Sequence, residues 1–163
     1  MALTYTEPSD PSTLVPAELA RELQQTVERG FKALCSLPEP LASRPLGADK
    51  WCVKQVIGHL IDSAANNHQR FVRLQIEPEL RLPGYRQEEW VRVQCYDRMP
   101  WMQTLETWRV MNLYLVHVVR HIDPAHLHRE WHSAGEPLAL GFIIEDYIAH
   151  MRHHLRQLPD YSG

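Results

Sequence analysis

The chain has 163 residues, of which 44% are hydrophobic and 23% are charged, and this composition is typical of one globular domain rather than of a disordered segment. Its formal net charge is −3 and its basic residues form no run, which argues against a nucleic-acid-binding or acidic-membrane-binding surface. No apolar stretch approaches the roughly 18 residues that span a bilayer, so no membrane segment is expected.

The first residues and the cysteines indicate a cellular compartment. The chain starts without the basic and apolar regions of a signal peptide, so we expect none. The three cysteines, Cys35, Cys52 and Cys95, are scattered and odd in number, which indicates reduced thiols rather than a disulfide framework. We therefore expect a cytoplasmic protein.

The first half of the chain contains two segments with the length and apolar spacing of amphipathic helices. The first spans about residues 16–37, with Pro16 suited to a first helical turn, and a proline-rich stretch that follows is expected to be a loop. The second spans about residues 49–76, with Asp49 as a candidate N-cap, and prolines end it.

The second half begins with a less regular stretch that is expected to hold a short helix at about residues 88–93. A third long helix spans about residues 102–122 and stops before Pro124. A turn-rich connection leads to the fourth long helix, at about residues 138–158, and Pro159 closes it.

These elements predict an all-α fold. No segment shows the period-2 alternation of a strand over a useful length. Four helices of about 20 residues, each with one apolar face, bury those faces best in a four-helix bundle. The long connection between the second and third helices suits a crossover, so we expect a single bundle domain over residues 1–163 with its core at about 16–159.

Histidine is over-represented, with ten residues in the chain. Imidazole nitrogen is a good ligand for zinc, nickel or iron, so this abundance suggests a metal site. Three pairs have the i, i+4 spacing that brings two side chains together on a helix: His117/His121, His128/His132 and His150/His154. The spacing alone is a weak signal, and two of the three pairs are expected not to bind metal.

Helical phase separates the three pairs. On the fourth helix, His154 lies on the same line as Tyr147 and Met151, and His150 lies at the edge of that apolar stripe. This pair would face the bundle interior or a cleft that opens into it, although a hydrogen-bonded or surface pair has the same spacing. The pair on the third helix lies away from the apolar line, toward solvent, and no rigid element holds the pair in the connection.

Zinc and nickel usually take three or more protein ligands, so a third residue is needed. The best candidate is His59, on the second helix, which lies beside a flank of polar residues that includes Ser63, Asn66 and Arg70. Such a flank is typical of the wall of a polar cleft and equally of an exposed helix face.

Two segments resemble helix signatures of the DinB superfamily. Residues 50–63, KWCVKQVIGHLIDS, resemble a tryptophan-containing helix start that leads to a metal-binding histidine, and residues 146–158, DYIAHMRHHLRQL, resemble a helix with two ligand histidines at i and i+4. The resemblance covers about residues 16–159. It implies a four-helix bundle, commonly dimeric, that binds one divalent ion through three histidines: His59, His150 and His154.

Three neutral imidazoles would leave a divalent ion, zinc or nickel on ligand grounds, with an open position, as in catalytic sites. Water held there would have its pKa lowered toward about 7, and a thiol cosubstrate would be held as thiolate. The sequence therefore predicts a metal-dependent hydrolase or thiol-dependent transferase that acts on a small molecule, and the resemblance implies a homodimer. The alternative is a non-catalytic metal-binding or stress-associated bundle.

The substrate and the general base do not follow from the sequence. The resemblance does not extend to the substrate residues of the thiol-dependent branches of the family. Asp62 follows His59 by three residues, but its helical phase turns it away. The candidates for lining the cleft, each equally typical of ordinary packing or surface positions, are Ser63, Asn66, Arg109, Asn112 and Tyr147.

Overall fold

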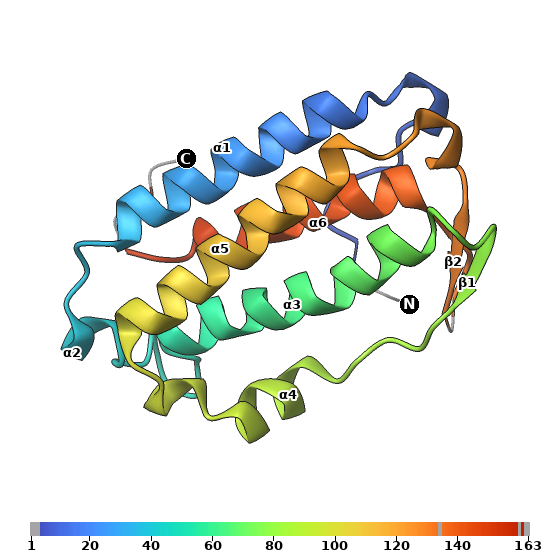
Figure 1. Cartoon of the computed structure of the whole chain (residues 1–163). Coiled ribbons are helices and arrows are strands. Elements are labelled where there is room, and N and C mark those ends of the chain that lie inside the picture. Colours follow the sequence, from blue (N-terminus) through green and yellow to red (C-terminus); the bar gives the residue numbers. More distant parts are fainter. Residues whose placement is uncertain (1–3, 134, 160, 162–163) are drawn as a thin grey trace.

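The computed structural model describes residues 4–133, 135–159 and 161. Its four long helices form a bundle (Figure 1): α1 (Pro16–Leu34), α3 (Val53–Arg73), α5 (Trp101–Arg120) and α6 (Leu140–Leu155). The predicted bounds lie within about four residues of the observed ones, because the apolar spacing marks the stretch that each helix buries. The predicted four-helix bundle is confirmed.

The connection between α3 and α5 determines the topology of the bundle. Both α1 and α3 pack against α5 and α6, so α1 and α3 occupy opposite corners. In Figure 1, α3 ends at the side of the small sheet whereas α5 begins at the far side, so the chain runs back along the whole bundle between them. The predicted crossover is therefore confirmed, and it carries α4 (Gln87–Gln94) and the 3-10 turn η2 (Tyr96–Arg98).

The start of α3 differs from the prediction. Asp49 is not the N-cap, because its backbone has a φ of 57° and belongs to a left-handed turn before the helix. The N-cap is Cys52, whose backbone N–H donates to the side-chain oxygen of Gln55 at 3.0 Å. The chain thus turns once more before the helix begins, a detail that N-cap preference alone does not reveal.

A short helix, α2 (Glu39–Ala42), occurs in the proline-rich stretch that was expected to be a loop. Long-range contacts of Glu39 stabilise it: the carboxylate accepts the backbone N–H of Trp101 at 2.7 Å and pairs with the ammonium group of Lys54, which is buried. These partners lie on α5 and α3, so no local sequence pattern could indicate them.

A small sheet covers one end of the bundle, and the sequence did not predict it. It contains β1 (Glu79–Arg81), β2 (Glu130–His132) and β3 (Leu138–Ala139) in that order, with β1 parallel and β3 antiparallel to β2. Strands of two or three residues are too short to show an alternating pattern. Leu80 pairs in register with Trp131 and both are buried, so the sheet closes the core at this end.

The apolar core involves all four long helices. Large, fully buried side chains from them include Leu23, Leu34, Ile57, Leu60, Phe71, Leu105, Trp108, Leu115 and Ile144. Burial of each such side chain contributes about 1.5–3 kcal/mol relative to exposure. None of the described helices has the length and apolar character needed to cross a membrane.

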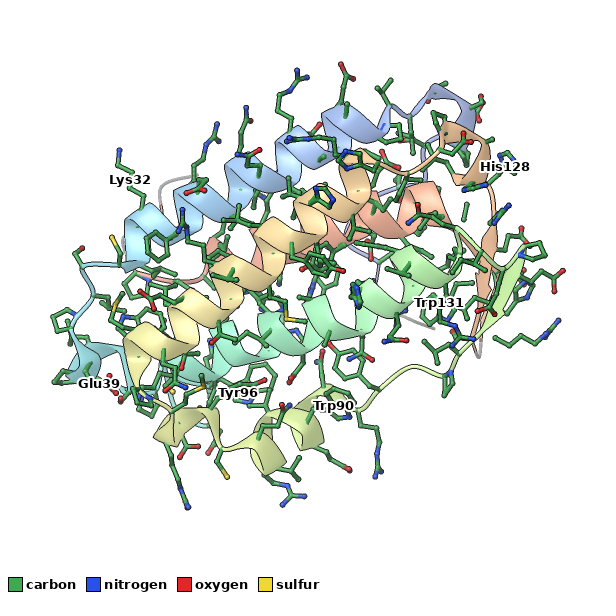
Figure 2. The ribbon with its side chains drawn as sticks, viewed as in Figure 1. Lys32, Glu39, Trp90, Tyr96, His128 and Trp131 are labelled. Carbon is green, nitrogen blue, oxygen red and sulfur yellow. The ribbon has the colours of Figure 1, made fainter. Side chains whose placement is uncertain are left out.

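Gly58 lets the crossover pack closely on α3, and this generates a prediction. A Cβ at this position would lie 2.2 Å from the ring of Tyr96, the residue labelled beneath α3 in Figure 2. Gly58→Ala should therefore force the tyrosine aside and lower the free energy of unfolding by about 1–3 kcal/mol in urea titration. Gly135→Ala is the matched control, because its Cβ would meet nothing within 4 Å. Equal stability of the two variants would contradict this packing.

Candidate metal centre

Three histidines from two helices converge inside the bundle. His59 comes from α3, and His150 and His154 come from successive turns of α6. One ring nitrogen of each lies within 4.8 Å of those of the other two, and the Nε2 atoms of His59 and His150 are 3.0 Å apart. His59 and His150 are buried, whereas His154 is half-buried. Among the described residues, no other three histidine, cysteine or acidic side chains come together in this way.

The spacing of these nitrogens fits ligands of a single metal ion. Two imidazole nitrogens that each lie about 2.1 Å from one ion are roughly 3.0–3.4 Å apart, and the pair formed by His59 and His150 matches this range. The hydroxyl of Ser63 lies 3.4 Å from Nδ1 of His150. Because this contact occupies Nδ1, the other ring nitrogen, Nε2, is free to point toward His59 and His154. The donor set is therefore suited to a divalent ion such as zinc or nickel.

Burial keeps the three imidazoles neutral. Desolvation lowers the pKa of His59 to about 4. Desolvation, together with repulsion from His154 and His59, lowers the pKa of His150 to about 2. Desolvation and the proximity of His59 lower the pKa of His154 to about 4. Since an imidazole must be neutral to ligate, the ligand set is ready at neutral pH without loss of protons.

A cavity of about 360 Å³ adjoins His59 and His150, two of the three histidines. Two of the predicted lining residues, Ser63 and Tyr147, lie in its wall together with His59 and His150. The wall also contains Arg70, from the polar flank beside His59, and residues that the sequence did not single out for this role: Tyr5, Asn67, Tyr85, Trp131 and Asp146. A cavity of this size, with mixed polar and apolar walls, can hold a small molecule.

The fold agrees with comparisons to known proteins. The model of the DinB superfamily matches residues 15–158. The chain belongs to the DinB superfamily. Among curated relatives, a protein of Bacillus mycoides (strain KBAB4) is 24% identical over 135 residues, which cover 82% of this chain and 78% of the relative. A protein of Oceanobacillus iheyensis is 27% identical over 109 residues, which cover 66% of this chain and 63% of the relative. Both bear the name "Putative metal-dependent hydrolase".

A solved structure shows the same DinB-superfamily fold. YfiT from Bacillus subtilis, described as a probable metal-dependent hydrolase with an unusual four-helix bundle topology, superposes with a TM-score of 0.84. The match covers 96% of this chain and 91% of YfiT at 17% sequence identity. At this identity, the likeness establishes the shared bundle topology.

Three of the predicted lining residues lie outside the cavity of this DinB-superfamily protein. Asn66 donates to a backbone carbonyl of its own helix at 2.9 Å, and Arg109 pairs with Glu28 at 3.2 Å on another face of the bundle. Asn112 is buried behind the wall, where it accepts a hydrogen bond from the Tyr147 hydroxyl. Those predictions are wrong because helical phase indicates the side of a helix but not where along the bundle a cavity opens.

Asp62 points away from the cavity, as its helical phase predicted. Its buried carboxylate accepts hydrogen bonds from the Tyr96 hydroxyl at 2.7 Å and from the Gln94 amide at 2.6 Å. Burial raises the pKa of Asp62 above its usual value. The residue thus ties the crossover connection to α3, and it is not placed to act as a base at the histidine centre.

Long-range contacts bring the unpredicted parts of the wall together. The ring of Tyr5 lies 4.8 Å from that of His150, and the backbone N–H groups of Tyr5 and Thr6 donate to the carboxylate of Asp146. Trp131 reaches the cavity from β2, at the sheet end of the bundle (Figure 2). The amino-terminal segment is distant in sequence from both helices and β2 is distant from α3, so no local motif marks these contacts.

The histidines of the two other i, i+4 pairs lie away from the centre. His117 and His121 are exposed on α5, with their ring centroids 4.4 Å apart. His128 is exposed, and His132 is half-buried within β2, which gives that connection more order than was expected. His153 is exposed next to the ligand pair.

The pKa values predict a specific acid sensitivity of the metal-free protein. Because the three pKa values are lower in the folded chain than the usual 6.5, the unfolded chain takes up these protons first as the pH falls. Their contribution to stability is therefore complete above about pH 6.5 and is lost as the pH falls to about 4 for His59 and His154 and to about 2 for His150. Urea titrations with chelator present should give a lower midpoint at pH 5 than at pH 7. His150→Gln should reduce that difference, and an unchanged difference would contradict the assignment.

Proposed function

We propose that this protein is a metal-dependent hydrolase in which His59, His150 and His154 hold one divalent ion, zinc or nickel. The observation that carries the proposal is the convergence of three neutral imidazoles, of which those of His59 and His150 lie in the wall of a cavity that suits a small molecule. When bound, an ion with three protein ligands and an open position supplies Lewis-acid activation of a water molecule or a thiol. The names of the relatives support the hydrolase assignment.

The role of the chain is to hold this ligand set rigidly and to limit the access of water. The hydroxyl of Ser63 orients the ring of His150. Edge-to-face packing of Phe71 on Tyr147, with centroids 5.8 Å apart, locks α3 against α6 beside the site. Tyr5 lies against His150 and His154 and shields them on the side of the amino-terminal segment.

A thiol cosubstrate in place of water would make the same site a transferase, and a rate measurement separates the two reactions. The metal-loaded protein should cleave an activated aryl ester without added thiol, and its rate should rise as the pH passes the pKa of the activated water, near about 7. A rate that requires thiol and increases in proportion to its concentration would favour transfer instead.

The ligand assignment predicts the metal content of single variants. His59→Ala, His150→Ala and His154→Ala each leave a two-histidine site, so metal affinity should fall by orders of magnitude. The helical circular dichroism of each variant should persist, because the apolar core does not contain these side chains. Elemental analysis of protein purified without chelating resin measures the outcome.

Histidines outside the centre provide matched controls for those variants. Metal content should be unchanged after alanine substitution of His117, His121, His128, His132 or His153. Loss of metal in a control, or one equivalent retained in every ligand variant, would place the site elsewhere. Collapse of the helical signal on chelation would instead support the alternative of a structural ion in a non-catalytic bundle.

We also propose that the protein is a homodimer in the cytoplasm, as the family resemblance and the reduced cysteines indicate. Sedimentation equilibrium should give a species of twice the 19.0 kDa chain mass, and a monomer at all concentrations would contradict the dimer.

A further inference from the structure

A buried arginine lies in the same cavity without a carboxylate partner. The side chain of Arg70, on α3, is only 8% exposed and contributes to the cavity wall. Its Nε is buried and makes no hydrogen bond within the described part of the chain. The ion pairs of the described residues include none with Arg70.

Neutral groups hold this guanidinium in place. One terminal nitrogen of Arg70 donates to the side-chain oxygen of Asn67 at 3.0 Å, and its central carbon lies 3.8 Å from the ring centroid of Trp131. The indole N–H of Trp131 donates to the carbonyl of Leu82 at 2.7 Å, so the small sheet fixes the ring on which the arginine rests. An amide and an aromatic face orient the positive charge but do not neutralise it.

The charge of Arg70 remains in the cavity at neutral pH. Burial lowers the pKa of Arg70 to about 10, so the guanidinium still carries its proton at pH 7. The carboxylate of Asp146 is engaged by backbone N–H groups of the amino-terminal segment, and burial raises the pKa of Tyr85 to about 12, which keeps that hydroxyl neutral. A buried charge without a counter-ion is unfavourable, so an anionic ligand would be stabilised here.

We propose that Arg70 binds a carboxylate of the substrate, with the bond to be cleaved at the histidine end of the cavity. The planar guanidinium can donate two parallel hydrogen bonds to a carboxylate. Asn67, which positions the arginine, follows His59 by eight residues, or about 12 Å along the helix axis. The substrate class is therefore an elongated small carboxylic acid rather than a neutral or cationic molecule. The position of the reacting bond rests on the proposed function, whereas the anion site does not.

Paired ligands that differ only in charge test this proposal. The probes are 6-mercaptohexanoate and 8-mercaptooctanoate with their neutral amides, whose thiol can ligate the ion while the other end reaches toward Arg70. Calorimetric titration of the metal-loaded protein should show at least one acid binding about tenfold tighter than its amide, since a hydrogen bond to a charged group is worth this much. In Arg70→Gln the preference should disappear, while metal content stays at the wild-type level.

Arg109→Gln is the matched control, because Arg109 is paired with Glu28 outside the cavity, and it should keep the full preference for the acid. Equal binding of acid and amide to the wild-type protein, or no binding of any probe to protein that holds its metal, would overturn the carboxylate site and leave the proposed function standing. A preference that survives in Arg70→Gln would also overturn it. These wild-type results decide the question even if that variant fails to fold.

If the wild-type protein holds no metal, the proposed function fails, and hexanoate and hexanamide still test Arg70 on the metal-free chain. The indole N–H resonance of Trp131, assigned with Trp131→Phe, should shift on titration with the acid and much less with the amide. Equal shifts would contradict an anion site.

Discussion

The packing of α3 against α6 is the contact on which the rest of the site depends. It brings Nε2 of His59 to 3.0 Å from Nε2 of His150. Two imidazoles that bind no ion need not approach this closely, whereas two ligands of one ion must. The same contact removes both rings from water and therefore keeps their pKa values far below the usual one. The geometry and the protonation state of the centre thus have one cause, which is burial between two rigid helices.

One face of α3 lines the cavity from the three-histidine centre toward the small sheet. His59 lies at one end, Ser63 and Asn67 follow at successive turns, and Arg70 completes the series. The crossover connection makes this arrangement possible, because it returns along α3 and leaves the sheet to close the far end with Trp131. The topology therefore places two of the three histidines and the positive charge of Arg70 in the wall of one cavity.

The sequence predicted the features that local spacing determines. The four helices and the inward phase of His150 and His154 follow from apolar periodicity, and the crossover follows from the length of the connection. His59 was found beside a polar flank of its helix. The features that it did not predict depend on distant contacts: Glu39 stabilises α2 through α3 and α5, Glu130 of β2 pairs with Glu79 of β1, and Tyr5 reaches α6. Asn112 was wrongly expected in the cavity wall for the same reason. A buried polar residue on the inner side of a helix can instead lie behind the wall and hydrogen-bond to a wall residue, as Asn112 does with Tyr147.

Crystals grown with zinc or nickel and measured at the absorption edge of the metal would locate the ion. We expect one strong anomalous peak within bonding distance of a nitrogen of each of His59, His150 and His154. A peak at another group of residues, or none between these three rings in crystals of protein that carries stoichiometric metal, would contradict that expectation.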